Sequence, residues 1–294
     1  MNIFKKGCQR DVAVEMERAA NTIKADLIVN VGDSFYDGGI LTTTDEQIKT
    51  SFLNVYNQPT LKSLSFLSVL GNHEYRGSAD AVLHISDKHN KRFYMESRNW
   101  ARVMTAGDTK IQFVFLDTTP MIASYAESKY DSEDDIMLQR EDGIKSQWPK
   151  IEENLQWLEN TLQANKGVQM RIVVGHHPLY SFSVHRGENR TMLQTRVGPL
   201  LEKYNVTAYL AGHEHNLQFA HPYKTAHFVS GAGSEIAPAF DVPDIPKRSV
   251  QFYYKENGFL ACIAYKSELR VAVVDMSGAV LDSVTVDSRT FKAR

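Results

Sequence analysis

The sequence predicts an α/β fold in which helices cover a sheet, and three observations lead to that prediction. Through the first two-thirds of the 294 residues, short apolar runs of strand length alternate with segments of helical periodicity. After Ala226 the strand-like runs follow one another directly, which indicates a second, largely antiparallel sheet. The length admits one large domain or two modest ones, and the chain contains no internal repeat or low-complexity linker.

The expected strands of the first part are apolar runs with the length of buried strands: 25–31, 65–70, 111–116, 171–174 and 207–211. Between them, three segments repeat apolar residues at the helical period and are expected to be helices: 12–23, 151–162 and 193–204. The later strands are expected around Phe228 and at 259–265, 269–274 and 280–286. The polar stretch 127–146 is expected to be a solvated surface loop.

The composition excludes several classes of protein. Hydrophobic residues make up 43% and charged residues 23%, as in ordinary globular proteins. The net charge of −2 gives no strong electrostatic footprint for nucleic acid or for an anionic membrane. The apolar runs are all shorter than the roughly 20 residues that a membrane span needs. We therefore expect neither nucleic acid nor membrane as a partner.

The two cysteines and the N-terminus carry little signal. Cys8 and Cys262 are far apart in the sequence, and we expect two free thiols, with Cys262 buried in the strand 259–265. Residues 1–7 are basic and have no apolar core, so we do not expect them to act as a signal peptide. Glycosylation sequons begin at Asn189 and Asn205 and matter only if the protein is secreted.

Four short polar clusters each begin where an expected strand ends: Gly32-Asp33-Ser34-Phe35-Tyr36, Gly71-Asn72-His73-Glu74, Gly175-His176-His177 and Gly212-His213-Glu214-His215. In open α/β sheets, ligands bind at the carboxyl ends of the strands. A glycine before each cluster permits a sharp turn and a close backbone approach. Although the clusters span most of the sequence, we expect them to converge on one point.

The residue types in these clusters indicate a metal centre. Aspartate, asparagine, tyrosine and histidine offer oxygen and nitrogen atoms without thiolate, which suits Fe, Zn, Mn or Mg. The two oxygens of Asp33 can bridge two ions, and a pair of ions forms a clamp that phosphatases use on phosphate esters. His177 is expected to be an orienting or surface residue. Four other histidines are expected to be structural or exposed: His84, His89, His221 and His227.

Taken together, the clusters resemble the metallophosphoesterase (calcineurin-like) superfamily, and most closely its purple acid phosphatase branch in the small single-domain form that includes the tartrate-resistant enzymes. Tyr36 is the decisive residue, because most members of the superfamily lack a tyrosine there. Further matching segments lie at 69–77, 115–120 and 229–234, and the resemblance extends from about residue 9 to residue 283. It implies a single domain over residues 1–294, folded as a four-layer α/β/β/α sandwich of two mixed sheets flanked by helices.

The resemblance also implies a ligand set. Asp33 would bridge the two metals, and Tyr36 and His215 would bind a ferric ion. A second, divalent ion (Fe, Zn or Mn) would be bound by Asn72, His176 and His213. His73 and His185 would face the phosphate as proton donors or electrostatic stabilisers. The match for His185 is looser, because it rests on the segment 183–188 alone.

By the same resemblance, the chain is an acid phosphatase that hydrolyses phosphate monoesters by attack of a metal-bound hydroxide at the Fe(III)–M(II) pair. Its substrates would be small phosphate monoesters or phosphoproteins, and its compartment secreted, secretory or lysosomal. One alternative is a phosphodiesterase or nucleotidase with two non-ferric ions, against which Tyr36 argues. Another is a degenerate relative that keeps the scaffold without catalysis.

The sequence departs from the family at its first motif, an Asp-x-Gly that ends the first strand and supplies a ferric ligand. No aspartate precedes Asp11, which falls within the first helical pattern. The expectation is that the first strand and this ligand are missing, with N-terminal truncation the favoured explanation and firm binding of only the divalent ion an alternative. We then expect an unpaired edge on the strand that ends near Asp33, weak iron retention and poor stability.

Overall fold

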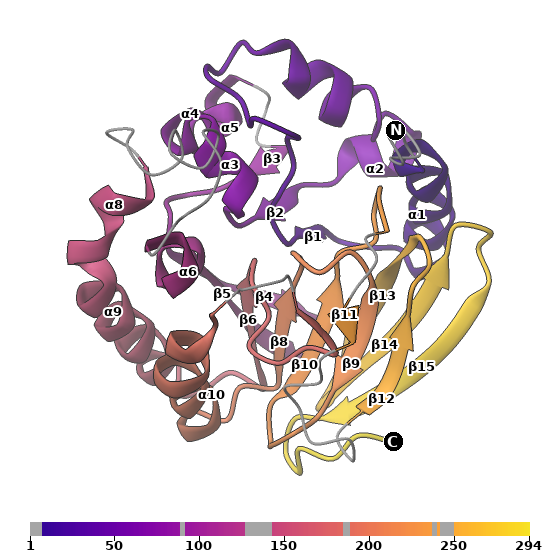
Figure 1. Cartoon of the computed structure of the whole chain (residues 1–294). Coiled ribbons are helices and arrows are strands. Elements are labelled where there is room, and N and C mark those ends of the chain that lie inside the picture. The colour runs from indigo at the N-terminus through magenta and orange to yellow at the C-terminus, as the bar shows by residue number, and fades with distance from the viewer. Residues whose placement is uncertain (1–7, 89–91, 127–142, 185–188, 237–239, 242–249) are drawn as a thin grey trace.

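A mixed sheet of seven strands runs through the middle of the molecule in the order β12-β9-β10-β8-β6-β5-β4 (Figure 1). The computed structural model describes residues 8–88, 92–126, 143–184, 189–236, 240–241 and 250–294. The strands are β4 (Trp100–Ala106), β5 (Thr109–Leu116), β6 (Met170–Gly175), β8 (Ala208–Ala211), β9 (Leu217–Ala220), β10 (Ala226–Ser230) and β12 (Val250–Tyr254). Strands β5, β6, β8 and β10 are parallel neighbours, so their carboxyl ends lie at one edge of the sheet.

Two three-stranded sheets accompany this large sheet in the described part of the chain. One is parallel and consists of β1 (Ile28–Asn30), β2 (Phe66–Ser68) and β3 (Phe93–Tyr94). The other is antiparallel and consists of β13 (Gly258–Tyr265), β14 (Glu268–Asp275) and β15 (Val280–Asp287). A short pair joins β7 (Ser183–Val184) and β11 (Phe240–Asp241).

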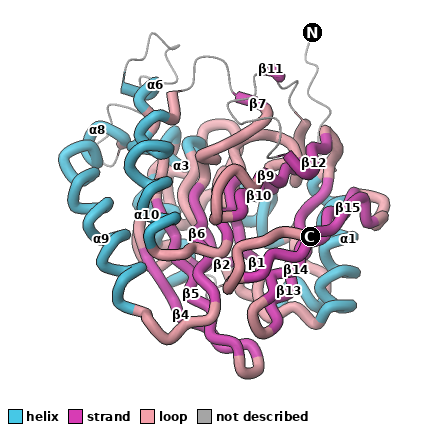
Figure 2. Tube along the Cα trace, turned by 90° about the horizontal axis from the view of Figure 1, so that it is seen from below, coloured by secondary structure: helices cyan, strands magenta, loops and turns pink. Residues whose placement is uncertain are grey.

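Helices flank the sheets. They are α1 (Gln9–Ile23), α2 (Pro59–Ser63), α3 (Asn72–Arg76), α4 (Ala79–Leu83), α5 (Ile85–Lys88), α6 (Ala123–Ala126), α8 (Ile144–Gln147), α9 (Ile151–Ala164) and α10 (Gly198–Lys203). A π-helical turn, Leu193–Val197, leads directly into α10 where one helix over 193–204 is expected. Viewed from below, α9 and α10 lie on one side of the molecule, and α1 and β15 on the other (Figure 2).

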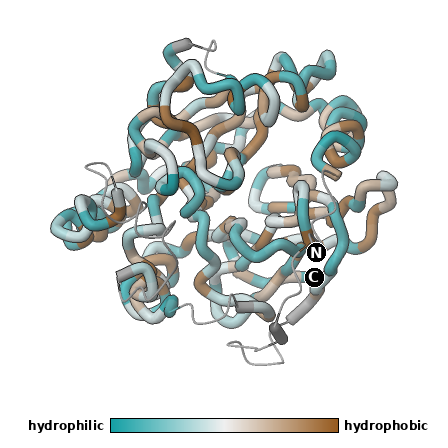
Figure 3. The backbone as a smooth tube through the Cα atoms, turned by 45° about the horizontal axis from the view of Figure 1, so that its top comes forward, coloured by the Kyte–Doolittle hydropathy of each residue, from teal (hydrophilic) through white to brown (hydrophobic). Residues whose placement is uncertain are grey.

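Side chains alternate between the two faces of each strand, so the large sheet contributes to two hydrophobic cores. In β5, Phe113 and Phe115 face the core between the sheets, while Val114 and Leu116 face the helices. Trp100 of β4 stacks on Phe115 with ring centroids 4.1 Å apart. On the helix side, every apolar residue of α9 at the predicted period is buried or half-buried. Hydrophobic and hydrophilic stretches alternate along the chain, and hydrophilic residues are frequent on its outer turns (Figure 3).

The predicted fold class is confirmed, since several sheets flanked by helices make a mixed α/β fold. The expected second, largely antiparallel sheet is present as β13, β14 and β15. Strands β1, β2 and β3 form a separate parallel sheet in the described residues, whereas the family resemblance implies two mixed sheets in all. The expected strand around Phe228 belongs instead to the large sheet as β10, because it pairs in parallel with β8. Strand pairing of this kind is long-range and leaves no trace in local periodicity.

Three smaller predictions meet different outcomes. Cys8 and Cys262 are free thiols, as expected. Cys262 lies in a strand but is exposed, which contradicts the prediction; β13 is an edge strand in the described part of the chain. Of the expected surface loop, 127–142 lies outside the described residues, and Ile144 is fully buried in α8.

The edge of β1 is also open. Strand β1 pairs with β2 on one side, and no strand of the described chain lies on its other side. All three of its residues are half-buried although two are strongly apolar. Among the described residues, no helix has both the length and the apolar character that a membrane crossing requires.

Candidate metal centre

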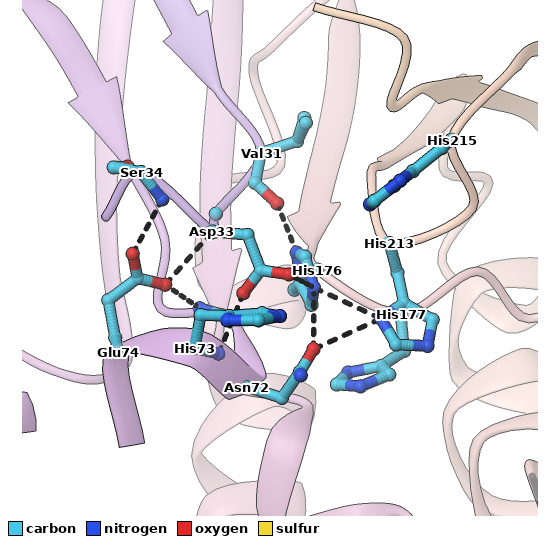
Figure 4. Close-up of polar contacts among 12 residues, drawn as sticks. Val31, Asp33, Ser34, Asn72, His73, Glu74, His176, His177, His213 and His215 are labelled. Atoms are coloured by element: carbon cyan, nitrogen blue, oxygen red, sulfur yellow. Dashed lines mark hydrogen bonds and ion pairs between the residues drawn. The ribbon is translucent and has the colours of Figure 1, made fainter. Parts of the chain in front are cut away.

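Four loops meet at the carboxyl ends of strands from two different sheets (Figure 4). Asp33 follows β1 and Asn72 follows β2, both in the parallel three-stranded sheet. His176 follows β6 and His213 follows β8, both in the large sheet. The two sheets therefore bring their strand ends to one place, as the sequence predicts from the position of the polar clusters.

The first half of the site is an amide and two imidazoles. Asn72 Oδ1 lies 3.2 Å from His176 Nε2 and 3.1 Å from His213 Nδ1. The two imidazole nitrogens lie 3.3 Å from each other. All three residues are buried. His176 and His213 lie 104 and 141 residues after Asn72 in the sequence.

Asp33 joins this half to the rest of the site. Its Oδ2 lies 3.0 Å from His176 Nε2, and its side chain is almost fully buried. Burial opposes ionisation of Asp33, but the neighbouring imidazoles, that of His176 first, hold its pKa well below its usual range. In return, and against the effect of its own burial, His176 has a pKa raised to about 8 by the Asp33 carboxylate.

The second half consists of Tyr36 and His215. The Tyr36 hydroxyl donates to Asp33 Oδ2 at 3.2 Å and lies 3.3 Å from His215 Nε2. Tyr36 is 37% exposed, so this half faces the solvent side of the site. Asp33 is thus the side chain that both halves share, which is the arrangement expected of a bridging ligand.

His73 lies beside both halves. Its ring centroid is 4.1 Å from that of Tyr36, and its Nδ1 donates to the carbonyl oxygen of Asp37 at 2.7 Å. That bond leaves Nε2 as the nitrogen available to a substrate. Burial lowers the pKa of His73, ahead of the opposing effect of the Asp33 charge. The neutral imidazole of His73 is therefore favoured over the imidazolium.

The donor atoms fit a bound metal. His176 Nδ1 donates to the carbonyl oxygen of Val31 at 2.8 Å, which turns the lone pair of Nε2 toward the cluster. Nitrogen ligands of a tetrahedral zinc ion, at about 2.0–2.1 Å from it, lie roughly 3.3 Å apart. The cluster atoms of Asn72, His176 and His213 already have that spacing. Three histidine nitrogens that include His177 also lie within 4.8 Å of one another.

His177 is more deeply involved than its sequence position indicates. It is fully buried, so the surface alternative is wrong. Its Nδ1 lies 3.0 Å from Thr118 Oγ1 and its Nε2 lies 3.1 Å from the Tyr125 hydroxyl. Its ring packs on that of His213 at 4.4 Å, which agrees with an orienting role. The only local signal for this position is the histidine doublet after β6.

The remaining histidines are placed as follows. His185 lies outside the described residues, and so does His89. His84 is exposed, and His221 is half-buried with its Nε2 bound to the Lys224 carbonyl. His227 is buried, and burial lowers its pKa to about 3. None of these last three contacts the cluster in the described part of the chain.

A buried polar network lies at the end of β5, against α3. The Tyr75 hydroxyl donates to Asp117 Oδ2, and Arg98 donates to the Tyr75 hydroxyl at 2.7 Å. Asn99 accepts the backbone N–H of Asp117 at 2.9 Å. Burial raises the pKa of Asp117 to about 6, although Arg98 and Tyr75 oppose the rise. The network fixes the helix that carries Asn72 and His73.

This raised pKa predicts a pH dependence of stability. Below pH 3.8 the Asp117 carboxyl is protonated in both the folded and the unfolded chain. Between that pH and about 6 the folded chain binds the extra proton, so the free energy of unfolding falls as pH rises. The loss amounts to roughly 3 kcal/mol at about 1.4 kcal/mol per pKa unit.

In the metal-free wild type, Asp117 should make the free energy of unfolding lower at about pH 6.5 than at about pH 4. Asp117→Asn removes the carboxyl group, so we expect this contribution to the difference to disappear. Urea denaturation at the two pH values measures it. Asp108→Asn, at an exposed aspartate, is the matched control and is expected to keep the wild-type slope. If the free energy of unfolding changed between the two pH values as much in the Asp117 variant as in the wild type, the raised pKa of Asp117 would be contradicted.

The chain is similar to known proteins along most of its length. The sequence model of the family described as calcineurin-like phosphoesterase matches residues 5–217. The chain is 31% identical over 273 residues to purple acid phosphatase 4 of Arabidopsis thaliana, covering 92% of this chain and 76% of that protein. It is 28% identical over 291 residues to tartrate-resistant acid phosphatase type 5 of Mus musculus, covering 94% of this chain and 83% of that protein.

Solved structures share the fold. GAP50, the anchor in the inner membrane complex of Plasmodium, superimposes with a TM-score of 0.76 at 20% identity, over 95% of this chain and 84% of that chain. The purple acid phosphatase PPD1 from yellow lupin (Lupinus luteus) gives a TM-score of 0.64 at 18% identity, over 95% of this chain and 49% of that chain. At these identities the likeness concerns the fold alone.

Proposed function

The chain belongs to the calcineurin-like phosphoesterase family, and from that premise we propose that it is an acid phosphatase that hydrolyses phosphate monoesters at a dinuclear Fe(III)–M(II) centre. Its curated relatives are acid phosphatases, which makes it a phosphoesterase. The observation that carries the finer proposal is the shared position of Asp33 between two sets of metal-binding side chains.

Each set of side chains suits a different ion. Tyr36 and His215, with Asp33, offer a phenol oxygen that becomes anionic when a metal ion replaces its proton, an imidazole and a carboxylate, which favours a ferric ion. Asn72, His176 and His213 offer one amide oxygen and two imidazoles, which suits divalent iron, zinc or manganese. When bound, such a pair of ions supplies a hydroxide nucleophile and neutralises phosphate charge.

The side chains of this protein then have defined tasks. Asp33 holds both halves of the site in register. His73, fixed by its bond to the Asp37 carbonyl, presents Nε2 to the substrate. When protonated, His73 can donate a proton to the leaving alkoxide. Small phosphate monoesters and phosphoproteins are the proposed substrates, and His185 is proposed as a second group facing the phosphate.

The test compares a phosphate monoester with a diester. With iron and zinc supplied at acid pH, the wild type is expected to hydrolyse p-nitrophenyl phosphate faster than bis(p-nitrophenyl) phosphate. His73→Asn is expected to lower kcat/KM for the monoester by roughly 10²–10⁴-fold, because it removes the proton donor. His84→Asn is the control, since His84 is exposed and does not contact the cluster.

Three outcomes would contradict the proposal. Preference for the diester would identify a phosphodiesterase. A His73 variant as active as the His84 variant would remove His73 from the mechanism. A metal-loaded wild type that hydrolyses neither ester would identify a scaffold without catalysis.

A secretory or lysosomal-type compartment belongs to the same proposal, with the two sequons as its support. Asn189 and Asn205 are both exposed, so each can carry a glycan. When the chain passes through a eukaryotic secretory pathway, we expect enzymatic deglycosylation to lower its mass. In Asn189→Gln, the mass lost on deglycosylation should be smaller by the mass of the glycan on Asn189. Secreted protein with both asparagines unmodified would contradict the expectation of a glycoprotein.

A further inference from the structure

Glu74 is a buried carboxylate next to the cluster that the ligand set does not use. It is 1% exposed and lies in α3, directly after Asn72 and His73. Its two oxygens accept three backbone N–H groups: Asp33 at 2.8 Å, Ser34 at 2.6 Å and Gly71 at 2.7 Å. Bonds between a carboxylate and backbone N–H groups are among the strong hydrogen bonds of proteins.

The backbone that Glu74 holds has an uncommon conformation. Gly32 and Asp33 both have positive φ, 93° and 54°. For a residue other than glycine the left-handed region costs about 1–2 kcal/mol, so Asp33 needs contacts that retain it there. The successive N–H groups of Asp33 and Ser34 point at one carboxylate and form an anion-binding concavity. In this case the anion belongs to the protein itself.

Contact across the two loops is mutual. While Glu74 accepts the N–H of Asp33, the Asp33 carboxylate accepts the N–H of His73 through Oδ1 at 2.9 Å. The loops also approach so closely at Gly71 that a Cβ atom there would overlap Asp33 Oδ1 and the Asp33 nitrogen. Each acidic side chain therefore fixes the backbone that carries the other (Figure 4).

We propose that Glu74 is a positioning residue for metal binding: its carboxylate fixes the Asp33 loop and the Asn72 loop relative to each other, and so sets the Asp33 oxygens toward both ions. The proposal rests on the metal centre of the proposed function and not on catalysis. Supporting contacts of this kind are typically worth 10–100-fold in metal affinity.

Glu74→Gln is the direct test. The glutamine keeps the shape of the side chain but has one oxygen for three N–H groups. Because Asp33 and Gly71 donate to one oxygen of the carboxylate and Ser34 donates to the other, at least one N–H group then faces the amide NH₂ instead of an acceptor. We expect the variant to bind Zn²⁺ and Mn²⁺ about 10–100-fold more weakly than the wild type. Calorimetric titration of the metal-free protein measures this. About pH 8.5 is suitable, because burial, with help from the Asp33 charge, raises the pKa of Glu74 to about 7.

Glu17 offers a matched control. Its carboxylate accepts two backbone N–H groups at the start of α2, from Thr60 at 3.0 Å and Leu61 at 2.9 Å. Glu17→Gln therefore removes the same kind of contact at a place remote from the four metal-binding loops. We expect it to lower the urea midpoint of the metal-free protein and to leave the metal affinity within about twofold of wild type.

A second variant protects the test against misfolding. Glu74→Asp keeps the charge on a shorter side chain, and we expect a metal affinity between those of the wild type and the glutamine variant. Wild-type affinity in both Glu74 variants would overturn the proposal. An equal loss in the Glu17 variant would also overturn it, because the effect would then be one of general stability. If the wild type bound metal but hydrolysed no ester, the proposed phosphatase function would be contradicted. The comparison of metal affinities between wild type and variants would still test the role of Glu74.

Discussion

The Asp33 carboxylate is the contact on which the rest of the site depends. One of its oxygens meets His176 and Tyr36, and the other accepts the N–H of His73. A charge this deeply buried is costly unless it is paired and hydrogen-bonded. The imidazole and the backbone supply that pairing in the folded chain, and cations would add to it. The site is therefore a set of loops that converge on one buried negative charge.

The sheets bring those loops together. The strand ends of the parallel three-stranded sheet and of the large sheet meet because one apolar core, which includes Phe66 of β2 and Phe115 of β5, fills the space between them. Rigid packing of this core fixes the distance between the loops. At the site itself, the hydrogen bond to the Glu74 carboxylate and the positive φ of Asp33 set the final position of the Asp33 loop. Core packing, loop conformation and charge pairing thus act on the same four strand ends.

The sequence predicts the convergence because each cluster has a local signature, an apolar run followed by glycine and polar side chains. It does not predict contacts between distant segments. His177 is buried by Thr118 and Tyr125, which are 59 and 52 residues away. Glu74 acts on backbone groups 40 and 41 residues away. The place of the strand around Phe228 in the large sheet and the exposure of Cys262 depend on which strands pair, and periodicity does not encode pairing.

The most direct measurement of the central claim is the number of metal ions that each chain binds. Metal-free protein would be dialysed to equilibrium against Mn²⁺, and bound manganese would be counted by elemental analysis beside a sample of Asp33→Ala. The account predicts two ions per wild-type chain and a loss of both in the variant, because both halves of the site share Asp33. A wild-type chain that binds one ion or none, or a variant that still binds two, would contradict it.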